Sequence, residues 1–507
     1  EILSKYVGPD TDSADLRRAR ALEKMLASEQ VCRDINEKGY GYSKYLQGAL
    51  YSAQVLIADI LGDIPRDIFV ASRFTGGATT SKRRTNGSPY YKYNHLDKVD
   101  VTPRLRPYAE ALVTATPMWC SSGGYFTIRS VLGNKITTVP KKSDIDRAIA
   151  MEPDMNQCMQ AALGSHIRGR LKTFGIDLND QSRNQRLALF GSKTGLVSTI
   201  DLSAASDSIS CRLVQDLLPP AWFELFDVTR SHRGTMPDGT VVKWEKFSSM
   251  GNGFTFELES MIFYALMVGT YNAFCGYVNY DLPPFSNYWK AHTSVYGDDI
   301  ICPSFMSGAL IEVLAAVGFK TNTDKTFIDG TFRESCGKHY FAGYDVTPFY
   351  VRKPIDHTNR VIWFLNKLRE WSYCETIGVC DPSVEQLWLQ MRRKYVPQEY
   401  LGGRNIGDDS CVYSIETPRK RLINLIKTRR IGGYRAFLAR AQDWGRGPDD
   451  HYIECQYASR STYVISDKGT PMLCKVVEHT WKCQRNVVHD PVTRWSRQKY
   501  LFPKEIK

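Results

Sequence analysis

Two adjacent carboxylates, Asp298 and Asp299, follow Gly297 between two short apolar runs. The flanking Val-Tyr and Ile-Ile pairs have strand composition, so the sequence predicts a β-hairpin that carries the acids at its tip. The two negative charges repel each other, and no basic residue lies beside them in the sequence. A divalent cation would relieve this repulsion, because Mg²⁺ and Mn²⁺ prefer carboxylate oxygens as ligands. A solvated acidic turn is the alternative interpretation.

A third carboxylate, Asp201, lies at the C-terminal end of a strand predicted over residues 196–202. Small residues follow, and a helix is predicted from about residue 206 to residue 218, where two prolines end it. A carboxylate at the end of a strand could face the hairpin tip and share one metal ion with it. Alternatively, Asp201 and, one turn later, Asp207 only cap the helix.

Two further segments complete a pattern. Gly251 and Asn252 belong to a Gly-Asn-Gly turn that enters an apolar stretch of helical length, residues 254–274. Such a turn lets the backbone approach a ligand and directs N–H groups at anions. The alternative interpretation is a plain loop before a core helix, and we expect the helix itself to be part of the core. Lys320 and Lys325 follow a helix predicted over residues 309–317, and each alone has the character of a surface lysine. The order of these four pieces is the motif order of the palm of a template-dependent RNA polymerase.

Several longer segments resemble the replicase catalytic subunit of the leviviruses, the small positive-strand RNA phages. They are residues 199–210, 249–260 and 332–337, with shorter matches at residues 138–142, 175–181 and 345–350. The resemblance is dense between about residue 136 and residue 355, and it is thin before residue 136 and after about residue 390.

The resemblance implies an α+β fold of the right-hand polymerase type, with fingers, palm and thumb and an antiparallel palm sheet flanked by helices. We expect the N-terminal region and fingers in residues 1–190, the palm in residues 191–345 with a fingers-side insertion at about 212–246, and the thumb and C-terminal region in residues 346–507. The sequence also predicts helices over residues 15–29 and 42–61.

For the chemistry, the resemblance implies two-metal phosphoryl transfer. Asp201 and Asp298 would hold two Mg²⁺ ions, for which Mn²⁺ can substitute, and Asp299 would be an adjacent or alternating ligand. Asp207 and Asn252 would hydrogen-bond the ribose 2′-hydroxyl and so reject a sugar that lacks it. Lys325 is the candidate proton donor to pyrophosphate, and Lys320 is its competitor.

Basic residues supply candidate contacts to phosphates. Lys141, Lys142 and Arg147 flank a Pro turn and would grip the incoming triphosphate. Residues 72–94 interleave basic and aromatic side chains, which suits an RNA strand, and a flexible surface loop is the equal alternative. Residues 419–446 carry nine Lys or Arg and one acid, which predicts a basic thumb helix along the product duplex or only a solvated helix face. The candidate RNA-binding residues are Lys82, Arg83, Arg84, Arg419, Lys420 and Arg421.

Composition agrees with a polyanionic partner, because the formal net charge is +12. Thirteen cysteines without a Cys-x-x-Cys pair argue against structural zinc and a disulfide framework, and favour reduced thiols in a cytoplasm. No membrane span or signal peptide is evident.

The expected partners are RNA template and product and NTPs. The resemblance adds host elongation factors Tu and Ts and a host small-subunit ribosomal protein that binds RNA, in the cytoplasm of a bacterial host.

Three rival functions remain open. A reverse transcriptase shares the metal-binding acids, but it would want a bulky side chain where Asp207 and Asn252 are expected. A two-metal nuclease would not need the triphosphate-facing lysines. A non-catalytic RNA-binding protein explains the positive charge but not the group of acids.

Overall fold

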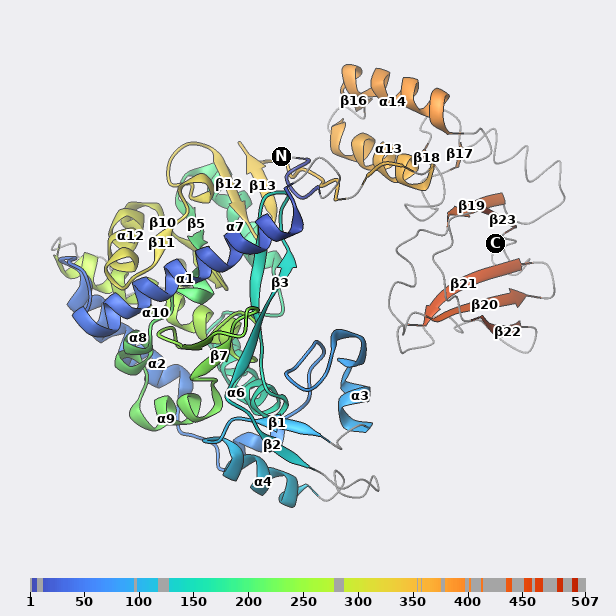
Figure 1. Cartoon of the computed structure of the whole chain (residues 1–507). Coiled ribbons are helices and arrows are strands. Elements are labelled where there is room, and N and C mark those ends of the chain that lie inside the picture. Colours follow the sequence, from blue (N-terminus) through green and yellow to red (C-terminus); the bar gives the residue numbers. More distant parts are fainter. Residues whose placement is uncertain are drawn as a thin grey trace. The chain divides into compact units, whose positions relative to one another are not determined.

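The computed structural model describes residues 2–6, 12–94, 98–116, 127–277, 287–352, 354–356, 358–374 and 379–396, together with short strands between residues 401 and 499. The chain divides into two compact units (Figure 1). The larger is Asp12–Thr347, and the smaller combines Glu1–Thr11 with Pro348–Lys507. Each unit is described by itself.

A three-stranded antiparallel sheet lies within the larger unit. Its order is β5 (Val197–Ile200), β10 (Asp299–Pro303) and β9 (Ser294–Tyr296), so β10 is central. Ile300 on β10 lies opposite Ile200 on β5 and opposite Val295 on β9. All three of these side chains are buried, which fixes the register of the sheet.

Helix α10 (Thr255–Tyr277) forms the centre of the core. From Thr255 to Tyr271, nearly every residue of this helix is buried, whichever side of the helix it lies on. This is the pattern of a helix enclosed by other elements. It packs against α2 (Leu46–Leu61), α6 (Asp154–Thr173) and α12 (Ser307–Ala316). These helices support the sheet that carries the candidate acids.

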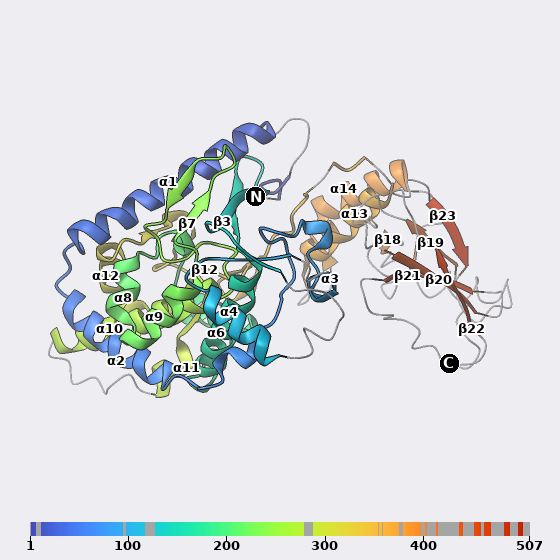
Figure 2. The ribbon, with the colours of Figure 1, turned by 60° about the horizontal axis from the view of Figure 1, so that its bottom comes forward.

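A second sheet has the order β4 (Asp146–Met151), β3 (Asn134–Pro140), β7 (Arg233–Thr235) and β8 (Val241–Lys243). The long helix α1 (Ala14–Lys38) runs along it (Figure 2). A small core of Met25, Ile136, Ala148, Ala150, Met236 and Trp244 joins helix and sheet. Strands from residues 233–243 therefore extend a sheet begun some hundred residues earlier.

The larger unit also contains shorter helices, 3₁₀ turns and strands. They are η1 (Ile68–Ala71), η2 (Arg84–Asn86), α3 (Pro89–Asn94), β1 (Val99–Val101), α4 (Arg106–Ala115), β2 (Ile128–Ser130), α7 (Ser182–Thr194), β6 (Leu202–Ser203), η3 (Ala205–Asp207), α8 (Cys211–Leu217), α9 (Pro220–Thr229), α11 (Asn287–His292), η4 (Ser304–Met306), β11 (Lys320–Thr321), η5 (Thr323–Lys325), β12 (Phe332–Ser335), β13 (Lys338–Phe341) and β14 (Tyr344–Asp345).

The smaller unit contains a pair of helices, α13 (Thr358–Ser372) and α14 (Pro382–Tyr395). Ile362 and Leu365 of α13 pack with Trp388 of α14 in a separate small core. The other described elements of this unit are β15 (Tyr373–Cys374), β16 (Val379–Cys380), β17 (Leu401–Gly402), β18 (Val412–Tyr413), β19 (Arg435–Ala439), β20 (His451–Tyr457), β21 (Ser461–Asp467), β22 (Trp481–Asn486) and β23 (Trp495–Lys499).

Most predicted elements of the larger unit are confirmed, including the hairpin and the helices expected near residues 15–29, 42–61, 254–274 and 309–317. The helix expected from residue 206 is wrong at its start. Its N-cap is Ser210, whose Oγ accepts a hydrogen bond from the Leu213 N–H, and Asp207 lies in a preceding 3₁₀ turn. The basic helix predicted over residues 419–446 is also wrong at Arg435–Ala439, the part of this range that the structure describes, because these residues form a strand.

The mixture of helices and antiparallel strands agrees with the α+β class. Among the residues that the structure describes, no helix combines the length and apolar character needed to cross a bilayer.

Candidate active site

The three candidate metal ligands lie at one end of the sheet β5-β10-β9. Asp298 follows Gly297 in the turn between β9 and β10, and Asp299 is the first residue of β10. Ile200 lies opposite Ile300 in antiparallel register. Asp201 follows Ile200 and Asp299 precedes Ile300, so these two aspartates lie opposite each other. The predicted strand over residues 196–202 is interrupted at Asp201, where the chain leaves β5 and then enters β6. The fold thus brings together acids that are nearly a hundred residues apart.

These acids share negative charge that the protein leaves largely uncompensated. Burial, reinforced by Asp298 and Asp201, raises the pKa of Asp299 to about 7, although the Cys336 backbone opposes the shift. Burial also raises the pKa of Asp201, even though Asn322 Nδ2 donates a 2.6 Å hydrogen bond to its Oδ2. The carboxylate of Asp298 makes no hydrogen bond or ion pair within the described residues. Such a donor set, carboxylate only and mutually repelling, suits a hard divalent cation.

Helix α10 fixes the turn that carries Asp298. The Gly297 N–H donates to Ser260 Oγ at 2.9 Å, and Gly297 has a φ of +61°. A Cβ at this position would lie 2.7 Å from Cε2 of Phe256, so both conformation and space require glycine. The acids therefore lie on a rigid hairpin held against a core helix.

Glu259 is a fourth carboxyl at this site, and sequence reasoning missed it. It lies on α10 beside the turn that carries Gly297 and Asp298, and its Oε2 accepts a 2.6 Å hydrogen bond from Ser206 Oγ. Burial raises its pKa to about 8, and Asp298 is among the smaller causes that raise it. Two acids, Glu257 and Glu259, near the start of a largely apolar helix were the available signal, since charged side chains are rarely buried without a partner.

The two candidate proton donors differ in their surroundings. Lys325 Nζ lies 2.7 Å from Glu334 Oε1. Burial lowers the pKa of Lys325, but the hydrogen bond to Glu334 and the charges of Glu334, Asp201 and Asp299 outweigh burial and raise it. Lys320 is exposed on β11 and pairs through its backbone with Ser203 on β6. Lys325 is thus the lysine that lies within the field of the acids.

Glu334 was not singled out from the sequence, and it is the residue that holds Lys325. Its Oε1 also lies 3.4 Å from Nε2 of His339. Burial raises the pKa of Glu334, but hydrogen bonds from His339 and Lys325 outweigh it and lower the pKa to about 2. The pair is therefore ionised on both sides at neutral pH.

The two candidate ribose contacts lie in different environments. Asp207 Oδ1 lies 2.8 Å from Nζ of Lys246, a lysine that is fully buried. Asn252 Oδ1 accepts a 3.0 Å hydrogen bond from the Phe254 N–H, and its amide nitrogen makes no hydrogen bond within the described part of the chain. No hydrogen bond joins Asp207 to Asn252 among the described residues. Each therefore keeps polar atoms that a ligand could engage.

Gly251 brings the Gly-Asn-Gly turn against β4. It has a φ of +108°, and a Cβ there would lie 2.2 Å from the backbone oxygen of Ala150. The Ala150 N–H also donates to the backbone oxygen of Met250 at 2.8 Å. Only glycine fits this close approach, which joins the turn to the second sheet.

The basic group predicted to grip triphosphate lies on the hairpin of β3 and β4. Burial lowers the pKa of Lys141, and the positive charges of Arg147, Lys24 and Lys142 lower it further, while Asp298 raises it. These cations therefore gather near the acid end of the first sheet. No ion pair neutralises Lys141, Lys142 or Arg147 within the described residues.

Lys24, which sequence reasoning missed, joins this group from helix α1. Arg17 on the same helix lies 3.2 Å from Asp146 Oδ1, and Arg20 donates to the Asp144 backbone oxygen at 2.9 Å. These bonds fasten α1 along the basic hairpin. Lys24 follows Arg20 by four residues, so it lies on the same face of the helix.

The predicted RNA-binding residues differ in how exposed they are. Arg83 precedes η2 and Arg84 is its first residue; both are exposed, and Lys82 is half-buried beside them. Lys92 of the same stretch is buried, and its Nζ donates to the Thr75 backbone oxygen at 2.7 Å and to Gln157 Oε1 at 2.9 Å. Lys92 is therefore not available to an RNA strand, and the other basic residues of the stretch 72–94 remain candidates. Arg419, Lys420 and Arg421 lie outside the described residues.

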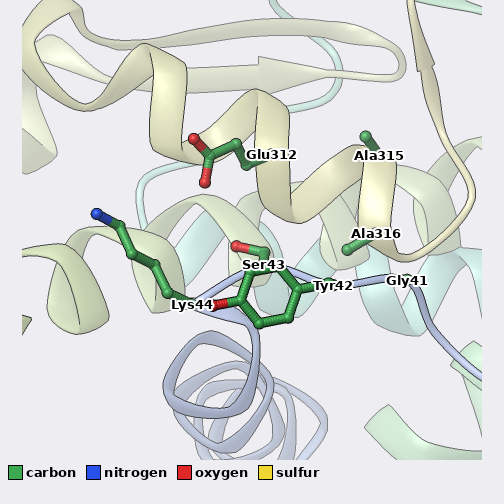
Figure 3. Close-up of a pocket in the computed structure, with 7 residues that line it drawn as sticks. All are labelled: Gly41, Tyr42, Ser43, Lys44, Glu312, Ala315 and Ala316. Atoms are coloured by element: carbon green, nitrogen blue, oxygen red, sulfur yellow. The ribbon is translucent and has the colours of Figure 1, made fainter.

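A pocket elsewhere on the larger unit holds none of the predicted site residues (Figure 3). Its lining consists of Gly41, Tyr42, Ser43, Lys44, Glu312, Ala315 and Ala316. Its charged residues are Glu312 and Lys44. This pair does not form a group of converging acids like that of Asp201, Asp298 and Asp299. The pocket adds nothing to the candidate active site.

The comparisons with known proteins concern nearly the whole chain. A family model described as "RNA replicase, beta-chain" matches residues 1–478. The chain is 39% identical over 470 residues to the RNA-directed RNA polymerase beta chain of Escherichia phage MS2, covering 88% of this chain and 82% of that protein. It is 42% identical over 431 residues to the RNA-directed RNA polymerase subunit beta of Escherichia virus Qbeta, covering 80% and 68%.

Among solved structures, the BmCPV RNA-dependent RNA polymerase at elongation state is similar with a TM-score of 0.42 and 12% identity, over 70% of this chain and 33% of that one. The extent of the sequence matches decides the family. This chain belongs to the RNA replicase beta-chain family.

Proposed function

We propose that this chain, an RNA-directed RNA polymerase of the phage replicase family, adds ribonucleotides to an RNA 3′ end by two-metal nucleotidyl transfer. One observation carries the proposal. Asp201, Asp298 and Asp299 converge at one end of a rigid sheet, where no described residue offers Asp298 or Asp299 a cationic partner within hydrogen-bonding distance. The unpaired cations of the β3–β4 hairpin gather near the same end.

The right-hand architecture is part of this proposal. We assign the palm to the sheet β5-β10-β9 with helices α10 and α12, and the fingers to the sheet β4-β3-β7-β8. The smaller unit would supply the thumb. The segment between α9 and α10 contributes β7 and β8 to the fingers sheet, in keeping with an insertion into the palm.

Mg²⁺ fits the acid group by chemistry, since its ligands would be carboxylates that form no ion pair with any described residue. No three His, Cys, Asp or Glu side chains in the described residues are arranged so that they could hold a metal ion as they stand. Ion binding would therefore include side-chain movement of Asp201, Asp298 and Asp299. Bound there, two ions would activate the 3′-hydroxyl and neutralise the leaving pyrophosphate.

The chain's own residues would do the rest. Lys141, Lys142 and Arg147 would bind the triphosphate, whose charge matches theirs. Lys325, held beside the acids by Glu334, would donate a proton to the pyrophosphate. Asp207 and Asn252 would hydrogen-bond the 2′-hydroxyl of the incoming nucleotide.

The proposed partners follow from the activity and the family. RNA template, RNA product and NTPs would be the substrates and products. Host elongation factors Tu and Ts and a host RNA-binding ribosomal protein would assemble with the chain in the cytoplasm of the bacterial host.

One assay tests the proposal against its rivals. Primer–template RNA and Mg²⁺ are incubated with the protein and either NTPs or dNTPs, and the products are separated by length. We expect extension with NTPs, and none by Asp298→Asn. Preferred use of dNTPs would identify a reverse transcriptase, shortening of the primer a nuclease, and an unchanged primer with tight RNA binding a non-catalytic protein.

A further inference from the structure

A buried lysine lies directly behind the candidate ribose contact. Lys246 is fully buried, and its Nζ lies 2.8 Å from Asp207 Oδ1 and 3.6 Å from Oε1 of Glu29 on helix α1. One ammonium thus serves two carboxylates from distant parts of the sequence. A lysine is rarely buried without such partners, because an isolated buried charge costs much free energy.

The backbone around Lys246 is fastened to the segment that follows Asp207. The Phe247 N–H donates to the Ile209 backbone oxygen at 2.7 Å, and Ser210 forms a β-bridge with Lys246. The Glu245 N–H donates to Glu29 Oε2 at 2.8 Å. The backbone of Lys246 is therefore held on both sides, and its buried ammonium lies between the carboxylates of Asp207 and Glu29.

Asp207 retains one free oxygen. Its Oδ1 is taken by Lys246, whereas its Oδ2 accepts no hydrogen bond from the described residues. The side chain is 16% exposed, so this second oxygen is within reach of a ligand. A carboxylate fixed at one oxygen presents the other in a defined direction.

We propose that Lys246 is a positioning residue for sugar choice: it orients Asp207 so that the free oxygen meets the ribose 2′-hydroxyl of the incoming nucleotide. The inference rests on the proposed role of Asp207 in reading the ribose. Lys246 itself touches no substrate. Its effect should therefore fall on the use of ribonucleotides and spare the use of deoxyribonucleotides.

The test is single-nucleotide incorporation of CTP and dCTP on one primer–template, with kcat and KM measured separately. In Lys246→Met we expect the preference for CTP to fall on the order of tenfold, mainly through a higher KM for CTP. The reason is that Asp207 is no longer oriented, so the hydrogen bond between its charged carboxylate and the ribose 2′-hydroxyl is lost. Incorporation of dCTP should stay close to the wild-type level. Glu29→Gln is the matched control: it changes the same buried cluster but leaves the bond between Lys246 and Asp207, so the preference should persist.

The double variant Lys246→Met/Glu29→Gln guards against misfolding, because it removes the carboxylate that would otherwise be buried without a partner. It should show the same selective loss of CTP use. Equal losses for CTP and dCTP in both Lys246 variants, including complete loss of both, would overturn the inference, since a purely structural role predicts that result. An unchanged preference in Lys246→Met would overturn it too.

Asp207→Asn separates this inference from the proposed function. If Asp207→Asn keeps the full preference for CTP, the ribose role of Asp207 is wrong. If Asp207→Asn loses the preference while Lys246→Met retains it, only the role of Lys246 is wrong.

Discussion

Asp201 and Asp207 are six residues apart, yet the fold treats their charges in opposite ways. Asp207 receives a buried ammonium from Lys246 at 2.8 Å. The carboxylate of Asp201 receives, among the described residues, a hydrogen bond from the neutral amide of Asn322 alone. It lies beside Asp298 and Asp299, and its pKa is raised by burial and by the charge of Asp298. A carboxylate whose charge a lysine of the protein already balances, such as Asp207, is suited to accept a hydrogen bond from a ligand. Carboxylates that it leaves unbalanced are suited to bind a cation from solution.

Glu259 shows a third way to bury a carboxyl beside these acids. Burial raises its pKa to about 8, so it is mostly protonated at neutral pH and needs neither an ammonium nor a metal ion. The three environments, ion-paired, unbalanced and protonated, predict different responses to substitution.

The largest effect should come from the unbalanced group. In Asp298→Asn the shape is kept and a charge is lost, so nucleotide addition should fall on the order of a thousandfold or more, the cost of losing a metal ligand in the transition state. Single-turnover primer extension measures this, and RNA binding measured by fluorescence anisotropy should be unchanged. Asp238→Asn, an exposed substitution of the same kind in the β7–β8 turn, is the control and should keep full activity. Near-normal extension by Asp298→Asn at saturating Mg²⁺ would contradict the assignment.

The next effect concerns the lysine that lies among the acids. Lys325→Gln should lower kcat by about a hundredfold, because general acid catalysis typically contributes that much or more. Lys320→Gln removes an exposed lysine five residues earlier and should leave kcat nearly unchanged. Rapid-quench measurement of single additions distinguishes the two. A large loss in Lys320→Gln together with a normal Lys325→Gln would reverse the assignment.

Sugar choice should respond more modestly. Asn252→Ala should weaken CTP use while barely changing dCTP use, with a loss of discrimination of roughly 1–3 kcal/mol, the cost of leaving a buried polar group unpaired. Asn272→Ala, at the far end of α10, removes an amide that bonds Ser52 and should have no effect on the preference. Paired incorporation of CTP and dCTP gives the ratio. If the ratio in Asn252→Ala equals that of the wild type, Asn252 only shapes the turn.

The smallest effect concerns the protonated carboxyl. Because the pKa of Glu259 is raised from 4.5 to about 8 in the folded protein, the unfolded chain releases this proton first, and stability falls as pH rises between those values. Glu259→Gln removes the titration but keeps a hydrogen-bond acceptor for Ser206. The melting temperature should therefore decline less between pH 6 and pH 8.5 in Glu259→Gln than in the wild type, by a few degrees.

Glu312→Gln changes an exposed glutamate and serves as the control for the melting experiment. Its melting temperature should follow the wild-type dependence on pH. The same decline in Glu259→Gln as in the wild type would show that Glu259 is already ionised at pH 6.

The elements that position the acids were predictable because their signals are local. The apolar stretch within residues 254–274 and the Gly-Asp-Asp hairpin depend on nearby residues, and both are present. The start of the helix after Asp207 was missed because Ser210 outcompetes Asp207 as a cap.

The partners of the site residues were not predictable, because they come from distant segments. Lys246 lies 39 residues beyond Asp207, and Glu29 lies on a helix near the N-terminus. The burial of Lys92 depends on Gln157 from another helix, which no pattern around residue 92 indicates. Order along the chain predicted which residues meet at the sheet, but not which charges the fold compensates.

Metal binding tests the central contrast most directly. Mn²⁺ is titrated into the wild type, Asp298→Asn and Asp207→Asn in the presence of primer–template RNA, and the bound ion is measured by electron paramagnetic resonance. We expect affinity to fall on the order of tenfold or more in Asp298→Asn, as for loss of a metal ligand, and to remain at the wild-type level in Asp207→Asn. Equal affinity in all three proteins, or a loss confined to Asp207→Asn, would contradict the account.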